Sequence, residues 1–140
     1  MPIDIKDSDS ALGVIFTGHR ILTENEYLDT YKKHLLQDRD KFQKYRYSLN
    51  DWTAVTEVKV SSDAIAQIAD LCRNAAKINP DIFVAHAANK TITFGLSRMW
   101  GILSEETKWE IMVFRNREDA EDWIRQKVKG KYGIGDLTFG

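Results

Sequence analysis

Cysteine and proline are scarce in this chain of 140 residues. The single cysteine, Cys72, excludes an internal disulfide, and no Cys-x-x-Cys or Cys/His set with zinc-site spacing occurs. The histidines His19, His34 and His86 show no metal-ligand spacing with one another. The few glycines form no GxGxxG phosphate loop after a strand. We therefore expect neither a metal site nor another cofactor.

An excess of one charge is also missing. Lys and Arg total 20 against 21 Asp and Glu, and neither sign is concentrated in one half of the chain. Nucleic-acid binding requires a clustered basic face, so no nucleic-acid partner is expected. No uncharged run approaches the ~20 residues of a membrane span, and the polar, acidic start MPIDIKDSDS is not a signal peptide. These features predict a cytoplasmic protein that does not insert stably into membranes.

The chain instead contains apolar segments that alternate with amphipathic ones. Apolar, β-branched or alternating patterns predict strands at residues 3–5, 11–18, 45–50, 82–88 and 108–114. The second of these expected strands ends in Gly18, and the third is expected to stop near Asn50–Asp51. Residues 53–60 are β-branched and fit either a further extended segment or a long loop. Residues 82–88 are continuously apolar, which is typical of a strand that is covered on both faces.

Four helices are expected between and after these strands. Thr23 and Glu26 form a T-x-x-E capping box for a helix to about residue 36, with Leu28, Tyr31 and Leu35 in its buried stripe. Ser61 or Ser62 caps the second helix, the third follows residues 82–88, and Asn116 caps the fourth. One face of the second helix carries Ile65, Ile68, Ala69, Cys72, Ala75 and Ala76, and the fourth turns Ala120, Trp123, Ile124 and Val128 inward.

The order β-β-α-β-α-β-α-β-α predicts an α/β fold. We expect a mixed, mostly parallel sheet of four or five strands, about four helices and an antiparallel edge at the N-terminus. A chain of this length fits a single domain, over residues 1–130. Residues 131–140 are glycine-rich and are expected to form a flexible tail or a short appended strand that docks Leu137 and Phe139.

The segment TITFGLSRMW at residues 91–100 raises the main functional question. At 100° per residue, one side of this helix carries Ile92, Leu96, Met99 and Leu103, which predicts the core stripe. Phe94 and Arg98 lie on roughly the opposite side, with Gly101 beside them. Arg98 fits either a solvated residue resting on Phe94 or part of a contact surface, because aromatic residues and Arg are enriched in interfaces. Phe94, Arg98 and Gly101 are thus a candidate interface for a protein partner or a second copy.

Polar side chains follow three of the expected strands. Asn50, Asp51 and Trp52 follow one strand, His86 lies near the end of another, and Arg115 follows the last. Ligands bind at the carboxyl ends of strands in open α/β sheets, so these five residues are candidates for the rim of a ligand-binding site, called the ligand rim below. No spacing marks them as a catalytic set, and a buried structural role for His86 is the competing interpretation. No catalytic residue is assigned.

The C-terminal half resembles a known family. FGLSRMWGIL followed by WEIMVFRNREDAEDWI is similar to the bacterial SpoIIAA-like, STAS/SEC14-type small domains, on Gly95, Arg98, Met99, then 113–115, then Ala120 and 123–124. The resemblance implies a SpoIIAA-like fold with helices largely on one face. It also implies a non-enzymatic regulatory or interaction domain like the anti-sigma-factor antagonists, which either forms a homodimer or binds another protein. The Sec14 side of the family implies instead a binder or carrier of a small apolar or lipid-like ligand, in a cleft between sheet and helices.

The antagonists carry a phosphorylatable serine at a helix start. The nearest match here is KVSSDAIAQ, with Ser61 and Ser62, although no Gly-Leu follows as in the family pattern. A phosphate at a helix N-terminus is favoured electrostatically. Helix capping accounts for the same two residues without phosphorylation, so both interpretations stay open.

Overall fold

The structure, a computed structural model, describes residues 3–140, except for the side chains of residues 35–37. One five-stranded sheet has the strand order β1-β2-β3-β4-β5. β1 and β2 pair antiparallel and the remaining neighbours pair parallel, so the α/β fold class predicted from the sequence is confirmed. The strands are β1 (Ile3–Ser8), β2 (Gly13–Thr23), β3 (Tyr47–Lys59), β4 (Phe83–Ala87) and β5 (Glu110–Phe114).

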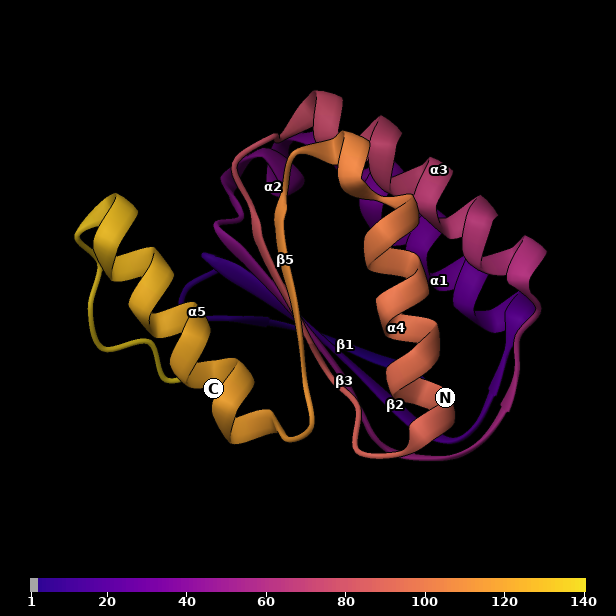
Figure 1. Cartoon of the computed structure of the whole chain (residues 1–140). Coiled ribbons are helices and arrows are strands. Elements are labelled where there is room, and N and C mark those ends of the chain that lie inside the picture. Colours follow the sequence, from indigo (N-terminus) through magenta and orange to yellow (C-terminus); the bar gives the residue numbers. More distant parts are fainter. Residues whose placement is uncertain (1–2) are drawn as a thin grey trace.

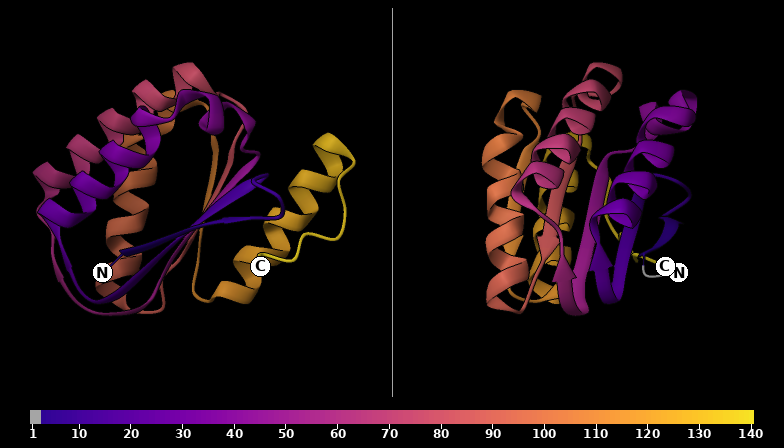
Figure 2. Two further views of the ribbon diagram at one scale, coloured as in Figure 1. Left: turned by 180° about the vertical axis from the view of Figure 1, so that it is seen from behind. Right: turned by 90° about the vertical axis from the view of Figure 1, so that its right-hand side faces the viewer.

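The helices form unequal layers on the two faces of the sheet. α1, α3 and α4 cover one face and α5 covers the other (Figure 1), and the side and back views agree (Figure 2). The apolar core is divided accordingly into two clusters, and β4 is buried along its whole length between them. The helices are α1 (Glu24–Gln37), α2 (Arg39–Lys44), α3 (Ser62–Ile78), α4 (Thr91–Leu103) and α5 (Arg117–Tyr132), with a short 3₁₀ turn η1 (Glu105–Thr107).

The helix starts expected from local sequence are confirmed. Thr23 Oγ1 accepts from the Glu26 N–H at 3.4 Å and Ser61 Oγ accepts from the Ala64 N–H at 3.1 Å. Asn116 Oδ1 accepts from the Asp119 N–H at 2.8 Å. These side chains satisfy backbone donors that have no partner inside the helix. The expected inner face of α3 is buried throughout, whereas the expected burial of Leu35 in α1 falls outside the described side chains.

β3 is longer than the sequence suggested. The strand expected to stop near Asn50–Asp51 continues to Lys59, and it includes most of the segment 53–60 whose structure was left open. The reason is non-local. β2 runs on to Thr23 beside it and supplies hydrogen-bonding partners through two register shifts. The expectation of a stop near Asp51 was therefore wrong.

The expected core stripe of α4 was wrong at its two ends, Ile92 and Leu103, whereas Leu96 and Met99 are half-buried and pack against the core. Ile92 is 56% exposed and Leu103 is 38% exposed, whereas Thr93, Ser97 and Trp100 are buried. The buried positions are displaced by one residue from the predicted ones, which corresponds to a rotation of the helix by about 100°. The small Thr and Ser side chains let α4 approach its neighbours closely, and the Trp100 ring lies 4.6 Å from the His86 ring. Three large apolar side chains of α4 consequently face outward: Ile92, Ile102 and Leu103.

The C-terminal residues pack against the α5 side of the sheet. α5 continues to Tyr132, and residues 133–140 have no regular secondary structure. Leu137 and Phe139 are nevertheless buried in the second core cluster. The Asp9 carboxylate accepts the N–H of Thr138 at 2.7 Å and that of Phe139 at 3.1 Å. Burial alone raises the pKa of Asp9, but these hydrogen bonds outweigh it and hold the pKa below its usual value.

Candidate functional site

A groove runs between α4 and the outer edge of β5. Its volume is about 420 Å³ and it is lined by Phe94, Arg98, Gly101, Ile102, Glu105, Ile111, Met112 and Val113. The three residues that the sequence suggested as an interface, Phe94, Arg98 and Gly101, therefore lie together. Gly101 leaves room at the floor, since a Cβ added there would lie 3.7 Å from Ile111 Cγ2. We call this hollow the α4–β5 groove.

The two ends of the groove differ in charge. The Arg115 guanidinium lies 3.7 Å above the Phe94 ring, a cation–π contact at the carboxyl end of β5. Arg98 is exposed beside it. Glu105 lies at the opposite end, after α4 has ended. Arg115, a candidate for the ligand rim, thus packs on Phe94 beside this groove and does not join the residues around His86.

Exposed apolar side chains are concentrated on the same elements. Of the six large apolar residues that are exposed within the described part of the chain, four lie on α4 and β5: Ile92, Ile102, Leu103 and Met112. Ile102 is 63% exposed and Met112 49%. Contiguous exposed apolar surface marks interaction sites in soluble proteins. Sequence reasoning missed Ile102, Met112 and Glu105 because their convergence depends on how α4 is rotated against β5.

Three of the remaining rim candidates are buried together. The Trp52 Nε1–H donates to His86 Nδ1 at 3.1 Å, and Asn50 Nδ2 donates to the Ala85 carbonyl at 3.3 Å. Asn50 also accepts from the hydroxyl of Tyr31. His86 has no exposed surface, and burial lowers its pKa to about 3. This neutral, inaccessible imidazole has the geometry of a packed core residue.

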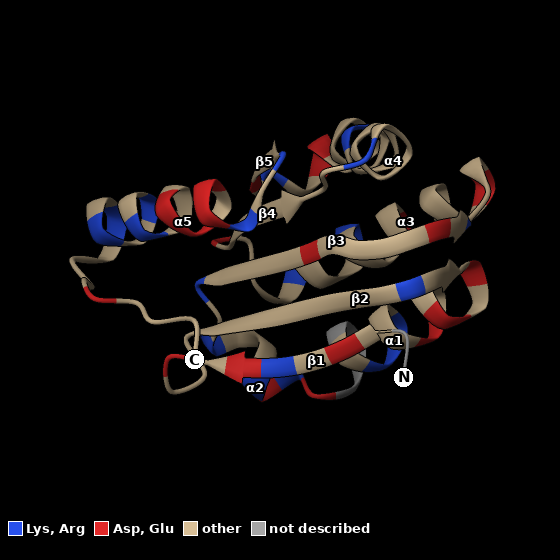
Figure 3. Cartoon of the chain, turned by 90° about the horizontal axis from the view of Figure 1, so that it is seen from below, with Lys and Arg blue, Asp and Glu red and all other residues tan. Residues whose placement is uncertain are grey.

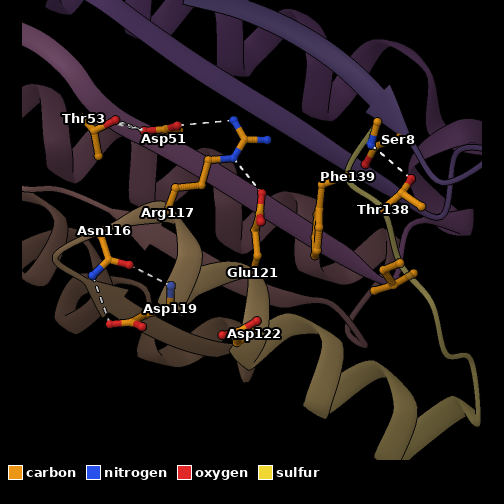
Figure 4. A network of polar contacts seen from close by, with 12 residues as sticks. Ser8, Asp51, Thr53, Asn116, Arg117, Asp119, Glu121, Asp122, Thr138 and Phe139 are labelled. Carbon is orange, nitrogen blue, oxygen red and sulfur yellow. Dashed lines mark hydrogen bonds and ion pairs between the residues drawn. The ribbon is translucent and has the colours of Figure 1, made fainter.

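Asp51 lies on the opposite face of the sheet. Its carboxylate accepts from the Thr53 N–H at 3.0 Å and pairs with Arg117 at 3.4 Å, while Arg117 Nε donates to Glu121 at 2.8 Å (Figure 4). This network ties α5 to β3. The five rim candidates therefore do not converge on one ligand site: Asn50, Trp52 and His86 are in one core, Asp51 is on the other face of the sheet, and Arg115 packs on Phe94 beside the α4–β5 groove.

Other candidate chemistry is limited in the described residues. Cys72 is buried, and burial raises the pKa of its thiol, as expected for a small core residue. Ser61 and Ser62 are both exposed at the start of α3, with Ser61 serving as the cap. Over residues 3–140, no group of three His, Cys, Asp or Glu side chains is arranged to hold a metal ion. α5 carries its Asp and Glu residues in its N-terminal half and most of its Lys and Arg residues in its C-terminal half, so the helix as a whole does not form a surface of one sign (Figure 3).

Two small interior hollows and one surface groove adjoin the sheet and the helices. The larger interior hollow, lined by residues such as Phe16, Tyr31 and Trp100, holds only about 20 Å³, which is room for about one water molecule, and the smaller holds about 10 Å³. The surface groove, of about 420 Å³, lies between β1, α1 and α2; its lining includes Ile3, Ile5 and Phe42 and the polar residues Lys33, His34 and Lys41.

The comparisons with known proteins identify the fold. No family model matches the sequence, and no curated protein does. Among solved structures, the chain is similar to an uncharacterised DUF3478-family protein from Shewanella loihica PV-4, whose crystal structure has a SpoIIAA-like fold. The match covers 87% of this chain and 91% of that one at 20% identity, with a TM-score of 0.51. The protein described here therefore has a SpoIIAA-like fold, as its C-terminal motifs suggested. Within the described residues, no helix combines the length and apolar character needed to cross a bilayer.

Proposed function

We propose that this protein is a non-enzymatic, cytoplasmic regulatory domain that acts by binding a protein partner through the α4–β5 groove. One observation carries the proposal: exposed apolar side chains of α4 and β5 adjoin an open strand edge and two arginines, Arg98 and Arg115. Apolar residues with Arg and aromatic side chains are the composition of energetically important interface centres. The resemblance to the STAS-type antagonists supports a regulatory role of this kind.

In-cell photo-crosslinking tests the proposal. A benzophenone amino acid replaces Ile102 in the groove, and in a matched variant it replaces Ile5, which is 41% exposed on the opposite edge strand. Irradiation is expected to give a protein adduct from position 102 and much less from position 5. If position 102 gives no protein adduct, or no more than position 5, the α4–β5 groove is not an interaction site.

A second candidate function is the binding of a small amphiphilic ligand. The groove between β1 and α1–α2 favours it, because the exposed side chain of Ile5 offers apolar surface in a groove that Lys33 and Lys41 also line. The interior hollow of about 20 Å³ does not support the alternative of an enclosed apolar cargo. Native mass spectrometry of the purified protein checks this function: a retained non-protein mass favours it, and a bare polypeptide mass contradicts it.

A further inference from the structure

The open edge of β5 is suited to pairing with the same edge of a second copy of the chain. We propose that the partner in the α4–β5 groove is a second copy of this chain, joined by antiparallel pairing of the two β5 strands about a two-fold axis. The two sheets would then form one continuous sheet. This inference rests on the proposed function, because it assigns the occupant of the same groove.

The pairing of β5 with β4 determines which backbone N–H and C=O groups of β5 are free to bond with another strand. The Phe114 carbonyl accepts the Ala88 N–H at 2.8 Å, so the polar groups of Phe114 face the β4 side. Because strand residues alternate between the two edges, Met112 also faces β4, whereas Ile111 and Val113 direct their N–H and C=O groups to the open edge. An antiparallel pair with Met112 on the axis places Ile111 opposite the partner's Val113. Each such pair exchanges both of its hydrogen bonds, so all the free groups of these two residues are satisfied.

The two edges of the sheet are protected differently. The outer strand β1 carries two exposed charges, Lys6 and Asp4, of which Asp4 pairs with His19 at 2.9 Å. Such charges discourage another strand from pairing with an edge. β5 has one acidic residue, Glu110, which is paired with Lys127 of α5 at 2.9 Å, and its next four residues are apolar. The edge next to the groove is therefore the one that accepts a strand.

The charges of the groove are self-complementary under this axis. Arg115 lies three residues beyond Met112, which is about 10 Å along the strand. Gly101, at the floor of the groove, lies beside Ile111. Glu105 follows Gly101 by four residues in the chain. Glu105 is therefore also about 10 Å from the axis, in the opposite direction. The axis inverts these directions, so Arg115 of each copy lies level with the partner's Glu105 on the same face of the sheet.

The same arrangement covers two of the exposed apolar side chains, Ile102 and Met112. A two-fold axis perpendicular to the sheet keeps both copies of α4 on one face, and it brings Ile102 of each copy toward the facing groove. Met112 meets its own counterpart on the other face. A closed, isologous interface of this kind buries the same patch on both copies and leaves no edge for further growth. Self-association thus accounts for both the strand edge and the apolar groove.

Sedimentation equilibrium on the full-length chain tests the inference. The parent protein is expected to reach twice the 16.1 kDa mass of one chain as concentration rises. Met112→Lys, which places like charges across the axis, should raise the dimer dissociation constant at least about tenfold. The matched variant Ile5→Lys, on the other edge, should change it less than about twofold. A parent that stays monomeric, or equal effects of the two variants, overturns the dimer.

Amide hydrogen exchange gives a second readout that depends on strand pairing. The amides of Ile111 and Val113 should exchange more slowly in the dimer than in the dilute monomer. Val113→Pro removes one outward N–H without removing a β4–β5 hydrogen bond, and it should abolish dimerisation while circular dichroism stays unchanged. If a dimer forms without protection of these amides, the pairing is wrong. Crosslinking at position 102 separates the proposed function from the proposed dimer. An adduct of twice the chain mass supports both proposals. An adduct only with another protein refutes the dimer and leaves the groove as an interaction site.

Discussion

Buried neutral His86 should make the protein lose stability in mild acid. The pKa of this imidazole is about 3 in the folded protein, whereas an exposed histidine titrates near 6.5. Between these values the unfolded chain binds a proton that the folded chain does not, so the free energy of unfolding falls as pH falls. The loss is about 1.4 kcal/mol per pH unit, which gives about 2 kcal/mol between pH 6.5 and pH 5.

The variant His86→Asn isolates this contribution. Asn offers an acceptor near the position of Nδ1, which receives the Trp52 N–H, but it does not titrate. Urea unfolding at one protein concentration, followed by tryptophan fluorescence at pH 7 and pH 5, gives the stability change for each protein. The parent should lose about 2 kcal/mol more than the variant. His19→Asn, which removes a partly exposed imidazole that pairs with Asp4 on the surface, serves as the control for losing a histidine outside the core. If the parent and His86→Asn lose the same stability, the imidazole is not held neutral by burial.

Two further predictions concern packing and the C-terminal residues. Gly18→Ala should destabilise the fold by about 1–3 kcal/mol, because the added Cβ would lie 2.7 Å from the Trp52 ring. Gly130→Ala places its Cβ in open space and should stabilise α5 by about 0.5–1 kcal/mol. Thermal unfolding compares the two variants, and equal changes in stability would contradict the close packing at Gly18. Asp9→Asn should release residues 133–140, and amide exchange and proteolysis of this segment should become faster. The parent should lose stability below about pH 4 as the Asp9 carboxylate protonates, and the variant should lack this contribution at every pH. Unchanged amide exchange would refute the anchoring role of Asp9.

Much of the fold was predictable because its signals are local. Thr23, Ser61 and Asn116 each cap a helix through a backbone donor three residues away, so their sequence context specifies the helix start. The uninterrupted apolar run at 82–88 indicated a strand covered on both faces, and β4 is buried between two core clusters. The order of elements then favoured a mostly parallel sheet, since crossover helices separate the strands.

The features that tertiary structure decided depend on distant partners. By helical spacing alone, Ile92 and Leu103 fit a core stripe as well as Thr93 and Trp100 do. Packing against α3, β3 and β5 buries the second pair. The burial of His86 against Trp52 could not be read from two residues 34 positions apart. In the same way, the sequence by itself determined which side chains α4 and β5 carry. Tertiary packing decided that Phe94, Arg98 and Gly101 line one groove, because helix rotation is set by steric fit between elements and not by periodicity alone.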